Sequence, residues 1–388
     1  MKIATIQAIP FHAERDTLSV TGTAGSPSKL QPGEARYRWA ENYPVIYSTG
    51  FETALVRITL DSGLVGWGEA QAPVAPEVAC TIIDRILAPV LEGSEFDGTR
   101  GEIESLWRRM YSAMRVRGQT GGFMLDAIAG IDIALWDLAG KLSGRPVAAL
   151  IGEHRVRVPA YLSGLPGGTV AGVRPWIAAG FQQMKIFHHA DVAQLLRDCD
   201  EALSYGCKIA VDALWRLTPE TAPAFEAELA SRSALWLEAP LQPESARAHG
   251  ELARSIRTPI AIGESYRTLF ELDPFFDAGA MRIVQPDLGR TGITEGLRIA
   301  REAQRRGIDV APHVSIAMGP QLAAAIHFAA AVPNCTVLEF NPNVLDTANR
   351  YLKEPLRVAE AEYRVPDGPG LGIDLDIHKP SRSRIGFS

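Results

Sequence analysis

Three carboxylates recur along the chain at a constant interval. Asp212, Glu238 and Glu264 are separated by 26 residues each time, about the length of one strand, one helix and their connections. If each residue ends a strand of one parallel sheet, the three side chains converge at one edge and repel one another unless a cation neutralises them. Oxygen ligands without Cys or His favour Mg²⁺ over zinc. The spacing therefore predicts a magnesium site on these three residues.

A histidine and an acid follow at later strand ends. His313 comes directly after Pro312, and Asp287 lies one strand and helix earlier. A carboxylate held beside an imidazole fixes its tautomer and raises its pKa, which makes a general base for work near neutral pH. A lone histidine is more often structural, so it is the pairing with Asp287 that favours a catalytic interpretation.

Two more strand-end residues carry charge. Glu339 can be a protonated acid that donates a hydrogen bond to a developing enolate oxygen, or an ordinary charge-paired residue. Lys185 can present a cation to a substrate carboxylate at the rim of the sheet, or it can extend along a strand edge towards solvent. The sequence leaves both pairs of alternatives open.

Short apolar segments precede these residues and predict the strands that position them. Both faces of the segments are apolar, which is typical of strands buried in a parallel sheet, and helical patterns separate them, one of them over 294–306. Eight such strands over about 230 residues predict a TIM-type barrel, whose active site lies at the carboxyl ends of its strands. The strands centre on 159–161, 184–187, 209–212, 236–238, 260–264, 283–287, 310–313 and 337–339.

The residues before the barrel predict an α+β unit over 1–126. A strand at 1–11 leads into a segment of low periodicity, about 12–50, which is either a lid or a simple excursion of the chain. Segments 52–60 and 64–70 flank a turn and predict a hairpin, and helical patterns follow over 76–91 and 103–114. As a lid, the long segment would carry near its tip Arg36, Tyr37, Arg38 and Trp39.

The remaining chain divides into two further parts. Residues 127–356 are assigned to the barrel, which opens with a long helix over 125–142. Residues 357–388 contain the turn cluster 365–370 and no barrel pattern, so we expect them to pack back on the first unit.

Composition excludes several classes of protein. Hydrophobic residues make up 46% of the chain and charged residues 22%, as in ordinary globular proteins. A net charge of −6 argues against a nucleic-acid partner. No apolar run reaches the roughly 18 residues of a membrane span, and the chain starts on a strand pattern, so we expect a cytoplasmic protein without a membrane partner. Four scattered cysteines predict small buried residues in a reducing compartment.

Taken together, these motifs resemble the enolase superfamily, and within it the mandelate racemase subgroup of acid-sugar dehydratases and related enzymes. The resemblance covers essentially the whole chain. It rests in part on Gly66-Trp67-Gly68-Glu69 and on the segment from Gly130 to Lys141. It rests also on the segments that contain the carboxylates and the histidine, which are Val211-Asp212-Ala213, Leu237-Glu238-Ala239-Pro240, Gly263-Glu264-Ser265, Gln285-Pro286-Asp287 and Pro312-His313-Val314.

The resemblance implies a fold, a cofactor and a chemistry. The fold is an α+β capping domain over a modified (β/α)7β barrel, and the cofactor is Mg²⁺ on the three carboxylates. The base is a dyad of His313 and Asp287, and Glu339 hydrogen-bonds the substrate carboxylate. The partner is then a small-molecule carboxylate, an acid sugar, and identical chains are expected to assemble into a homo-oligomer.

On the second strand the chain departs from the racemases of the subgroup. These carry K-x-K, whereas this chain has Lys185-Ile186-Phe187, so a second base on the opposite face of the substrate is missing. His188 and His189 are alternative bases, but they fall beyond the strand end. A racemase or epimerase needs an acid and a base on opposite faces, so the sequence favours a dehydratase that eliminates water from an aldonate or aldarate.

Two alternatives to dehydration stay open. A cycloisomerase acting on a sugar-acid lactone uses the same enolate and one base, and the ending 366–373 resembles such enzymes as well. A catalytically silent member of the superfamily would have lost ligands or the dyad, and all are present. Specificity is expected from the long N-terminal segment, from 341–351 and from a set of candidate substrate-binding residues: Trp215, Arg216, Tyr266, Arg267 and Arg38.

Overall fold

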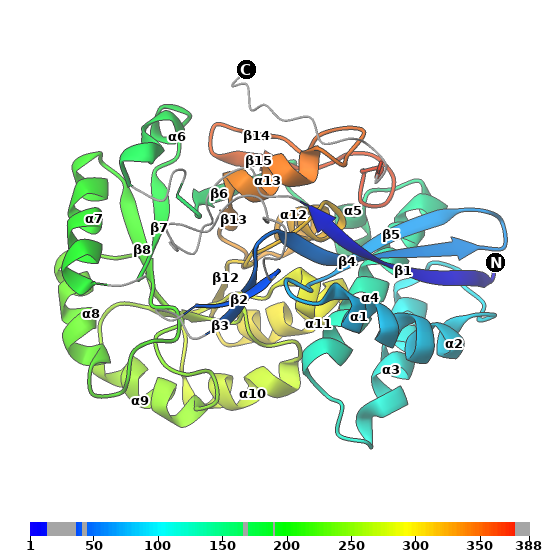
Figure 1. The fold of residues 1–388 in the computed structure, drawn as a ribbon, viewed down its shortest axis with the longest axis horizontal. Helices are drawn as coiled ribbons and strands as arrows, with labels where there is room; N and C mark the ends of the chain where they lie inside the picture. Colours follow the sequence, from blue (N-terminus) through cyan, green and yellow to red (C-terminus); the bar gives the residue numbers. More distant parts are fainter. Residues whose placement is uncertain (14–35, 41–44, 166–169, 189–190, 377–388) are drawn as a thin grey trace.

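A three-stranded antiparallel sheet forms one side of the molecule (Figure 1). The computed structural model describes residues 1–13, 36–40, 45–165, 170–188 and 191–376. In it, β1 (Ile3–Ala13), β4 (Phe51–Leu60) and β5 (Val65–Ala70) pair in the order β1-β4-β5. In the turn between β4 and β5, Gly63 has a φ of 83°, a conformation that favours glycine. The predicted hairpin is therefore confirmed.

Helices cover this sheet, as the sequence predicts for 76–91 and 103–114. The first stretch is divided among three consecutive segments, of which the middle one, η1, is a π-helix. Thr99 caps α3 by accepting a hydrogen bond from the Glu102 backbone N–H. The segments are α1 (Pro76–Ile82), η1 (Ile83–Leu87), α2 (Ala88–Leu91) and α3 (Arg100–Arg115).

The long segment 12–50 contains a second hairpin, which the sequence did not predict. β2 (Tyr37–Ala40) pairs with β3 (Val45–Ser48) in antiparallel register. Residues 37–39, expected near the tip of a loop, lie instead on β2, with Arg36 just before it. The parts of the predicted lid at 14–35 and 41–44 lie outside the described residues.

Helix α4 (Gly122–Ser143) lies between the two units and is buried along most of its length. A Cβ atom at Gly68 of β5 would lie 1.9 Å from the carbonyl oxygen of Gly130, so only glycine allows this close approach. On the other side, Asp132 of α4 accepts hydrogen bonds from Thr294. The expected domain boundary at 126/127 thus falls inside a helix that packs against both units.

Eight parallel strands form the barrel, and all eight predicted strands are confirmed. Neighbours pair in chain order from β6 to β12, and β13 returns to pair with β6. A bridge between Val310 and Cys335 joins β12 to the segment before β13 and closes the ring. The strands are β6 (Arg157–Leu162), β7 (Gln183–Phe187), β8 (Lys208–Asp212), β9 (Leu237–Glu238), β10 (Ile260–Ile262), β11 (Ile283–Val284), β12 (Asp309–Val310) and β13 (Leu338–Phe340).

Helices follow the strands and surround the barrel (Figure 1). One of them, α11, begins at Leu288, six residues before the predicted start at Thr294, because Asp287 caps it. The backbone leaves helical geometry at Gly292 and resumes it immediately. The helices are α6 (Arg174–Ala178), α7 (Val192–Ser204), α8 (Ala222–Ser231), α9 (Ala246–Ser255), α10 (Leu269–Ala278), α11 (Leu288–Arg305), α12 (Pro320–Ala331) and α13 (Pro342–Asn349). The short helices η3 (Val170–Val173) and α5 (Val147–Ile151) complete the set among the described residues.

The C-terminal segment packs largely against the barrel, whereas we expected it on the first unit. β14 (Val358–Ala359) and β15 (Glu362–Arg364) form a hairpin, and β15 pairs with β6. Leu371 then donates its backbone N–H to Asp137 of α4 and accepts a hydrogen bond from His327 of α12. Asp137 also accepts a hydrogen bond from the Trp67 backbone N–H of β5, so this carboxylate links the C-terminal segment to the first unit. Residues 377–388 lie outside the described part of the chain.

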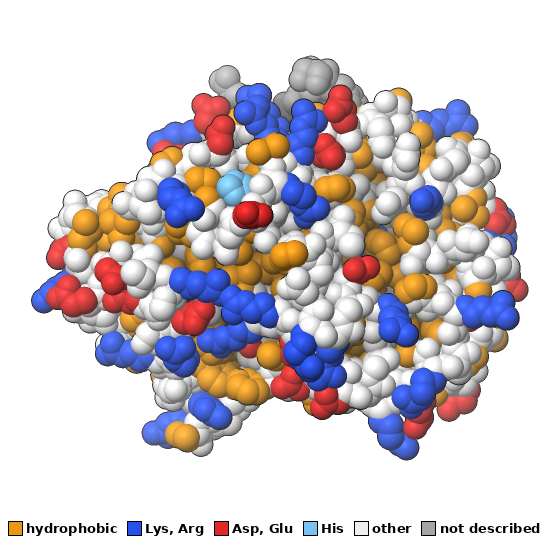
Figure 2. Space-filling model, turned by 180° about the vertical axis from the view of Figure 1, so that it is seen from behind, with side chains coloured by type: hydrophobic (Ala, Val, Ile, Leu, Met, Phe, Trp, Pro, Cys, Tyr) orange, Lys and Arg blue, Asp and Glu red, His pale blue; other side chains and the backbone are white. Residues whose placement is uncertain are grey.

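The described surface carries charges of both signs. On the face drawn in Figure 2, acidic and basic side chains are interspersed. None of the described helices combines the length and the apolar character that a membrane span requires. All four cysteines are buried, as predicted.

Candidate metal and acid-base site

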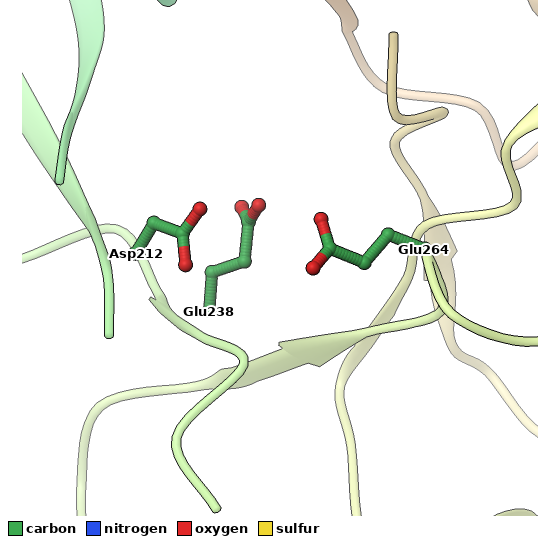
Figure 3. Close-up of side chains that lie close together, drawn as sticks. All are labelled: Asp212, Glu238 and Glu264. Carbon is green, nitrogen blue, oxygen red and sulfur yellow. The ribbon is translucent and has the colours of Figure 1, made fainter. Parts of the chain in front are cut away.

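The three spaced carboxylates meet at the carboxyl ends of neighbouring strands. Asp212 ends β8, Glu238 ends β9, and Glu264 lies two residues after β10. One ligand atom from each lies within 4.8 Å of the others, and Figure 3 shows the carboxylates pointing towards a common space. At Gly263, with a φ of 155°, a Cβ atom would lie 2.4 Å from the Gln285 backbone nitrogen. Glycine is therefore needed to place Glu264.

Hydrogen bonds fix the orientation of the buried Glu238. Its Oε2 accepts from Trp236 Nε1 at 3.0 Å and from Gln285 Nε2 at 2.7 Å. Both donors lie inside the barrel and are buried, so the carboxylate is held in one position.

The residues after β8 hold the other two carboxylates. Leu214 donates its backbone N–H to Asp212 Oδ1, and Trp215 donates Nε1 to Glu264 Oε1, both at 2.8 Å. Leu214 and Trp215 have φ values of 54° and 58°, in the left-handed region that non-glycine residues rarely adopt. Backbone strain of this kind concentrates at functional sites, and here it directs the indole onto a carboxylate of the cluster.

Lys185 lies beneath the carboxylates and not at the rim of the barrel. Its Nζ is 2.5 Å from Glu238 Oε1, 3.0 Å from Glu339 Oε1 and 3.8 Å from Asp212 Oδ2. Burial alone would lower the pKa of this amine, but Glu238 and Glu339 raise it well above its ordinary value. The alternative of a side chain that extends to solvent is therefore wrong, because Lys185 is a fully buried cation.

Lys185 does not neutralise the whole cluster. Burial, followed by the charge of Glu238, raises the pKa of Asp212 well above its ordinary value, although Lys185 lowers it. Besides burial, the negative charges of Glu238 and Glu264 contribute to this raised pKa, as expected for carboxylates that lie close together. A divalent cation would remove the repulsion, and an all-oxygen donor set with room at the partly exposed Glu264 suits Mg²⁺. These residues therefore fit a Mg²⁺ ion.

The structure brings His313 and Asp287 together beside this cluster. His313 Nδ1 lies 2.8 Å from Asp287 Oδ2, and Nε2 lies 3.1 Å from Glu264 Oε2. Asp287 is fixed in turn, because its Oδ1 accepts from the Gly289 backbone N–H and from Gln321 Nε2. Burial alone would lower the pKa of His313, but the charges of Glu264 and Glu339 and the bond to Asp287 raise it to about 10.

Glu339 is an ionised carboxylate in this arrangement, and not the protonated acid that we considered. Its Oε2 accepts from the Val314 backbone N–H at 3.0 Å, and its Oε1 pairs with Lys185. Burial would raise the pKa of Glu339, but the charges of Lys185 and His313 lower it to about 2. Because two cationic side chains favour its ionised form, the Glu339 carboxylate accepts hydrogen bonds and does not donate them.

A cavity of about 410 Å³ opens above the cluster. Strand β3 and the strand ends of the barrel line it together, so both units contribute. Apolar side chains make up much of the wall. The lining residues from the first unit are Val45, Ile46, Tyr47, Ser48, Phe51, Pro73 and Val74. Those from the barrel include Ser163, Phe187, Asp212, Trp215, Glu264, Arg290, His313, Ser315, Glu339 and Asn341.

Of the five candidate substrate-binding residues, Trp215 alone lines this cavity in the described structure. The other side chains have different contacts: Arg216 donates to the His188 carbonyl, and Tyr266 donates to the Pro243 carbonyl. Arg267 forms two hydrogen bonds with Asp126. Arg38 lies on β2 outside the lining set. Spacing places these residues near the strand ends but does not give the direction of their side chains.

Sequence reasoning missed Arg290 and the apolar residues of β3. A signal for Arg290 was present, because it lies three residues after Asp287, in the first turn of the helix that follows a candidate strand. The predicted specificity segment 341–351 does contribute, through Asn341 and Val344.

His188 does not reach the cavity, so it cannot replace the missing second base. Side chains alternate along β7, and Lys185 and Phe187 take the inner positions. The His188 ring instead lies 5.2 Å from the ring of Phe225 on α8. The pKa of His188 is lowered, mainly by burial. His189 lies outside the described residues.

Comparisons with known proteins agree with this architecture. Residues 42–152 match the mandelate racemase and muconate lactonizing enzyme N-terminal domain, and residues 169–379 match the enolase C-terminal domain-like family. The chain is 31% identical to D-galactarolactone cycloisomerase of Agrobacterium fabrum and 32% identical to D-galactonate dehydratase of Ralstonia nicotianae. Each match covers 83% of this chain and 88% of the relative. A solved structure of an enolase superfamily member from Agrobacterium tumefaciens superposes with a TM-score of 0.88 at 32% identity, over 97% of each chain.

Proposed function

The chain belongs to the enolase superfamily, in its mandelate racemase and muconate lactonizing enzyme group, and from this we propose that it is a Mg²⁺-dependent acid-sugar dehydratase. The observation that carries the proposal is the orientation of His313, whose Nδ1 is held by Asp287 while Nε2 lies beside Glu264 at the cavity. The relatives named as sugar-acid dehydratases and as a cycloisomerase support this class of reaction.

The carboxylate cluster would hold the cofactor. Asp212, Glu238 and Glu264 would bind Mg²⁺, which when bound supplies positive charge next to the substrate carboxylate and makes removal of the neighbouring proton easier. Lys185 holds Glu238 and Glu339 in place from below and adds a second positive charge. Because these groups are positioned before substrate arrives, little reorganisation is needed during the reaction.

His313 is the proposed base in its neutral form: a cation held by Glu264 would neutralise the charge that does most to raise the pKa of His313, and Nε2 would then be able to accept a proton. Its Nε2 takes the proton from the carbon alpha to the carboxylate, and the electron pair of that C–H bond moves into the carboxylate to give an enediolate. The electrons then return, the bond from the β-carbon to its hydroxyl group breaks, and the proton on Nε2 leaves with the hydroxyl as water. The resulting enol becomes a 2-keto-3-deoxy acid. Asp287 keeps the imidazole oriented through both steps.

Cycloisomerisation of a sugar-acid lactone is the second candidate, and two observations favour it. The relative from Agrobacterium fabrum is named for that reaction. The inner position on β7 that faces the cavity holds Phe187, which has no acid-base chemistry, so a reaction with one base suits the site. The same feature disfavours a racemase or epimerase. A catalytically silent protein is disfavoured because the carboxylates and the dyad are assembled.

A panel of aldonates, aldarates and their lactones, supplied with Mg²⁺, tests the proposal. Dehydration gives a product lighter by one water that reacts as a keto acid, whereas cycloisomerisation gives an isomer of unchanged mass. If no compound of the panel exchanges its α-proton in D₂O, the proposed function is wrong. Assembly of identical chains stays a separate prediction, which sedimentation of the protein would measure.

A further inference from the structure

Arg290 is a cation whose charge is poorly compensated by its described neighbours. Its Nε is buried and has no hydrogen-bond partner. Its ion pair is long, with Nη1 3.8 Å from Asp126 Oδ1. Asp126 forms its shorter bonds, at 3.0 and 3.2 Å, with Arg267. The guanidinium groups of Arg267 and Arg290 thus interact with the same carboxylate, and Arg290 lies farther from it.

The position of Arg290 in α11 adds to this imbalance. Arg290 lies in the first turn of the helix, where the positive end of the helix dipole disfavours a cation. The nearest acid along the chain, Asp287, is already engaged by Gly289, Gln321 and His313. A guanidinium without a close carboxylate partner can form charge-assisted hydrogen bonds with an anionic ligand.

Arg290 lines the cavity of the candidate site, and it also lines a neighbouring pocket beside Asp126 and Arg267. It lines that cavity together with Pro73 and Val74 of the first unit, which places it on the wall where the two units meet. Its side chain keeps 21% of its surface exposed, whereas that of Lys185, at the floor, keeps 1%. A substrate with one end over the carboxylate cluster can therefore extend its other end towards Arg290.

Building on the proposed function, we propose that Arg290 binds a second carboxylate at the far end of the substrate, so that the enzyme prefers aldarates or their lactones to aldonates. Two N–H groups of one guanidinium can bind both oxygens of a carboxylate, and the Arg290 side chain is partly exposed where it lines the cavity. An aldonate presents a neutral hydroxymethyl group at that end. This group leaves the cation unpaired, which costs binding energy.

Matched pairs of acid sugars test this inference. Each pair is a hexaric acid and the hexonic acid of the same configuration, which differ only in the far carboxylate. We measure kcat/KM for both members with Mg²⁺, and their dissociation constants calorimetrically in the His313→Asn background, where the chemistry is blocked. The wild-type arginine should favour the diacid at least tenfold, and Arg290→Met should remove most of that preference while changing the monoacid little.

Two controls isolate the charge of Arg290. Arg290→Lys keeps a cation without the paired geometry and should retain a reduced preference. Arg298→Met makes the same change farther along α11, where Arg298 pairs with Glu295 and lies over the ring of Trp107, and should leave the preference intact. Diacid binding that depends on Arg290, without turnover of any compound, would support this inference and contradict the proposed function. Three results would overturn the inference. The wild type could turn over or bind both acids without preferring the diacid, the preference could survive in Arg290→Met, or neither acid could bind.

Discussion

His313 and Asp287 come from adjacent barrel strands and meet through a contact of 2.8 Å between Nδ1 and Oδ2. The same carboxylate caps α11, because its Oδ1 accepts the Gly289 backbone N–H. The Asp287 side chain therefore caps a helix through Oδ1 and orients the candidate base through Oδ2. This division allows the two roles to be separated by mutation.

Asp287→Asn should damage catalysis far more than folding. Asparagine remains a good helix cap through its oxygen, so the free energy of unfolding should change by about 1 kcal/mol or less. The amide nitrogen would then face His313 Nδ1 and favour the wrong tautomer. By analogy with the loss of orientation in other acid-histidine pairs, kcat should fall about 10²- to 10⁴-fold. Steady-state kinetics and denaturant unfolding of the same variant measure both effects. An unchanged kcat would show that Asp287 serves only the helix.

Glu264→Gln should weaken Mg²⁺ binding at least tenfold, measured by calorimetry, because it removes one of three anionic ligands. Glu226→Gln is the matched control. Glu226 is a buried carboxylate that accepts hydrogen bonds from Thr258, which precedes β10 and so lies at the opposite end of that strand from Glu264. Its loss should lower stability and leave Mg²⁺ affinity unchanged. Equal Mg²⁺ affinity in wild type and Glu264→Gln would rule out the proposed ligand set.

Glu52 should position the hairpin β2–β3 over the cavity. Its buried carboxylate accepts from Tyr37 Oη at 3.0 Å and from Ser48 Oγ at 2.8 Å, one residue on each strand of the hairpin. Glu52→Gln loses part of these bonds, so KM should rise about two- to tenfold with a smaller change in kcat. Amide hydrogen exchange over 45–48 should become faster. Arg57→Gln, on the exposed side of β4, should change neither KM nor the amide exchange over 45–48. Unchanged amide exchange in Glu52→Gln would contradict the role of Glu52 in positioning the hairpin.

His327 should make the protein less stable in mild acid. Its Nδ1 accepts from the Ala148 backbone N–H and its Nε2 donates to the Leu371 carbonyl, so the buried ring is neutral. Burial lowers its pKa to about 4 from an ordinary value of 6.5. The unfolded chain therefore takes up this proton first, and stability that is full above pH 6.5 falls as the pH drops towards 4, by up to about 3 kcal/mol. Urea unfolding should show this part of the pH dependence in wild type and not in His327→Gln; parallel curves would contradict it.

Much of the fold could be predicted from the sequence because its signals are local. Short apolar strands followed by helices gave all eight barrel strands, and Asp61-Ser62-Gly63 gave the hairpin of the first unit. The hairpin β2–β3 was missed because its strands have only four residues each, too few to show a clear alternation of apolar and polar side chains. The pairing of the C-terminal segment with β6 was also not predicted, because it joins residues about two hundred positions apart in the chain.

The candidate site was predictable in its backbone positions and less so in its side-chain directions. Regular spacing brought Asp212, Glu238 and Glu264 together because each lies at or just beyond the carboxyl end of its strand. Arg267 was expected in the pocket, but it lies after a strand end, where the chain turns, and it is bound to Asp126. The charge state of Glu339 depends on the nearby charges of Lys185 and His313, and the spacing of residues along the sequence does not show how these three side chains interact.

The central claim is that His313 removes the α-proton, and exchange of that proton in D₂O tests it most directly. With Mg²⁺ and an acid sugar that the wild type turns over, we predict that His313→Asn loses α-proton exchange by about 10²- to 10⁴-fold while its Mg²⁺ affinity stays within about twofold of the wild type. Exchange at the wild-type rate in His313→Asn would contradict the account.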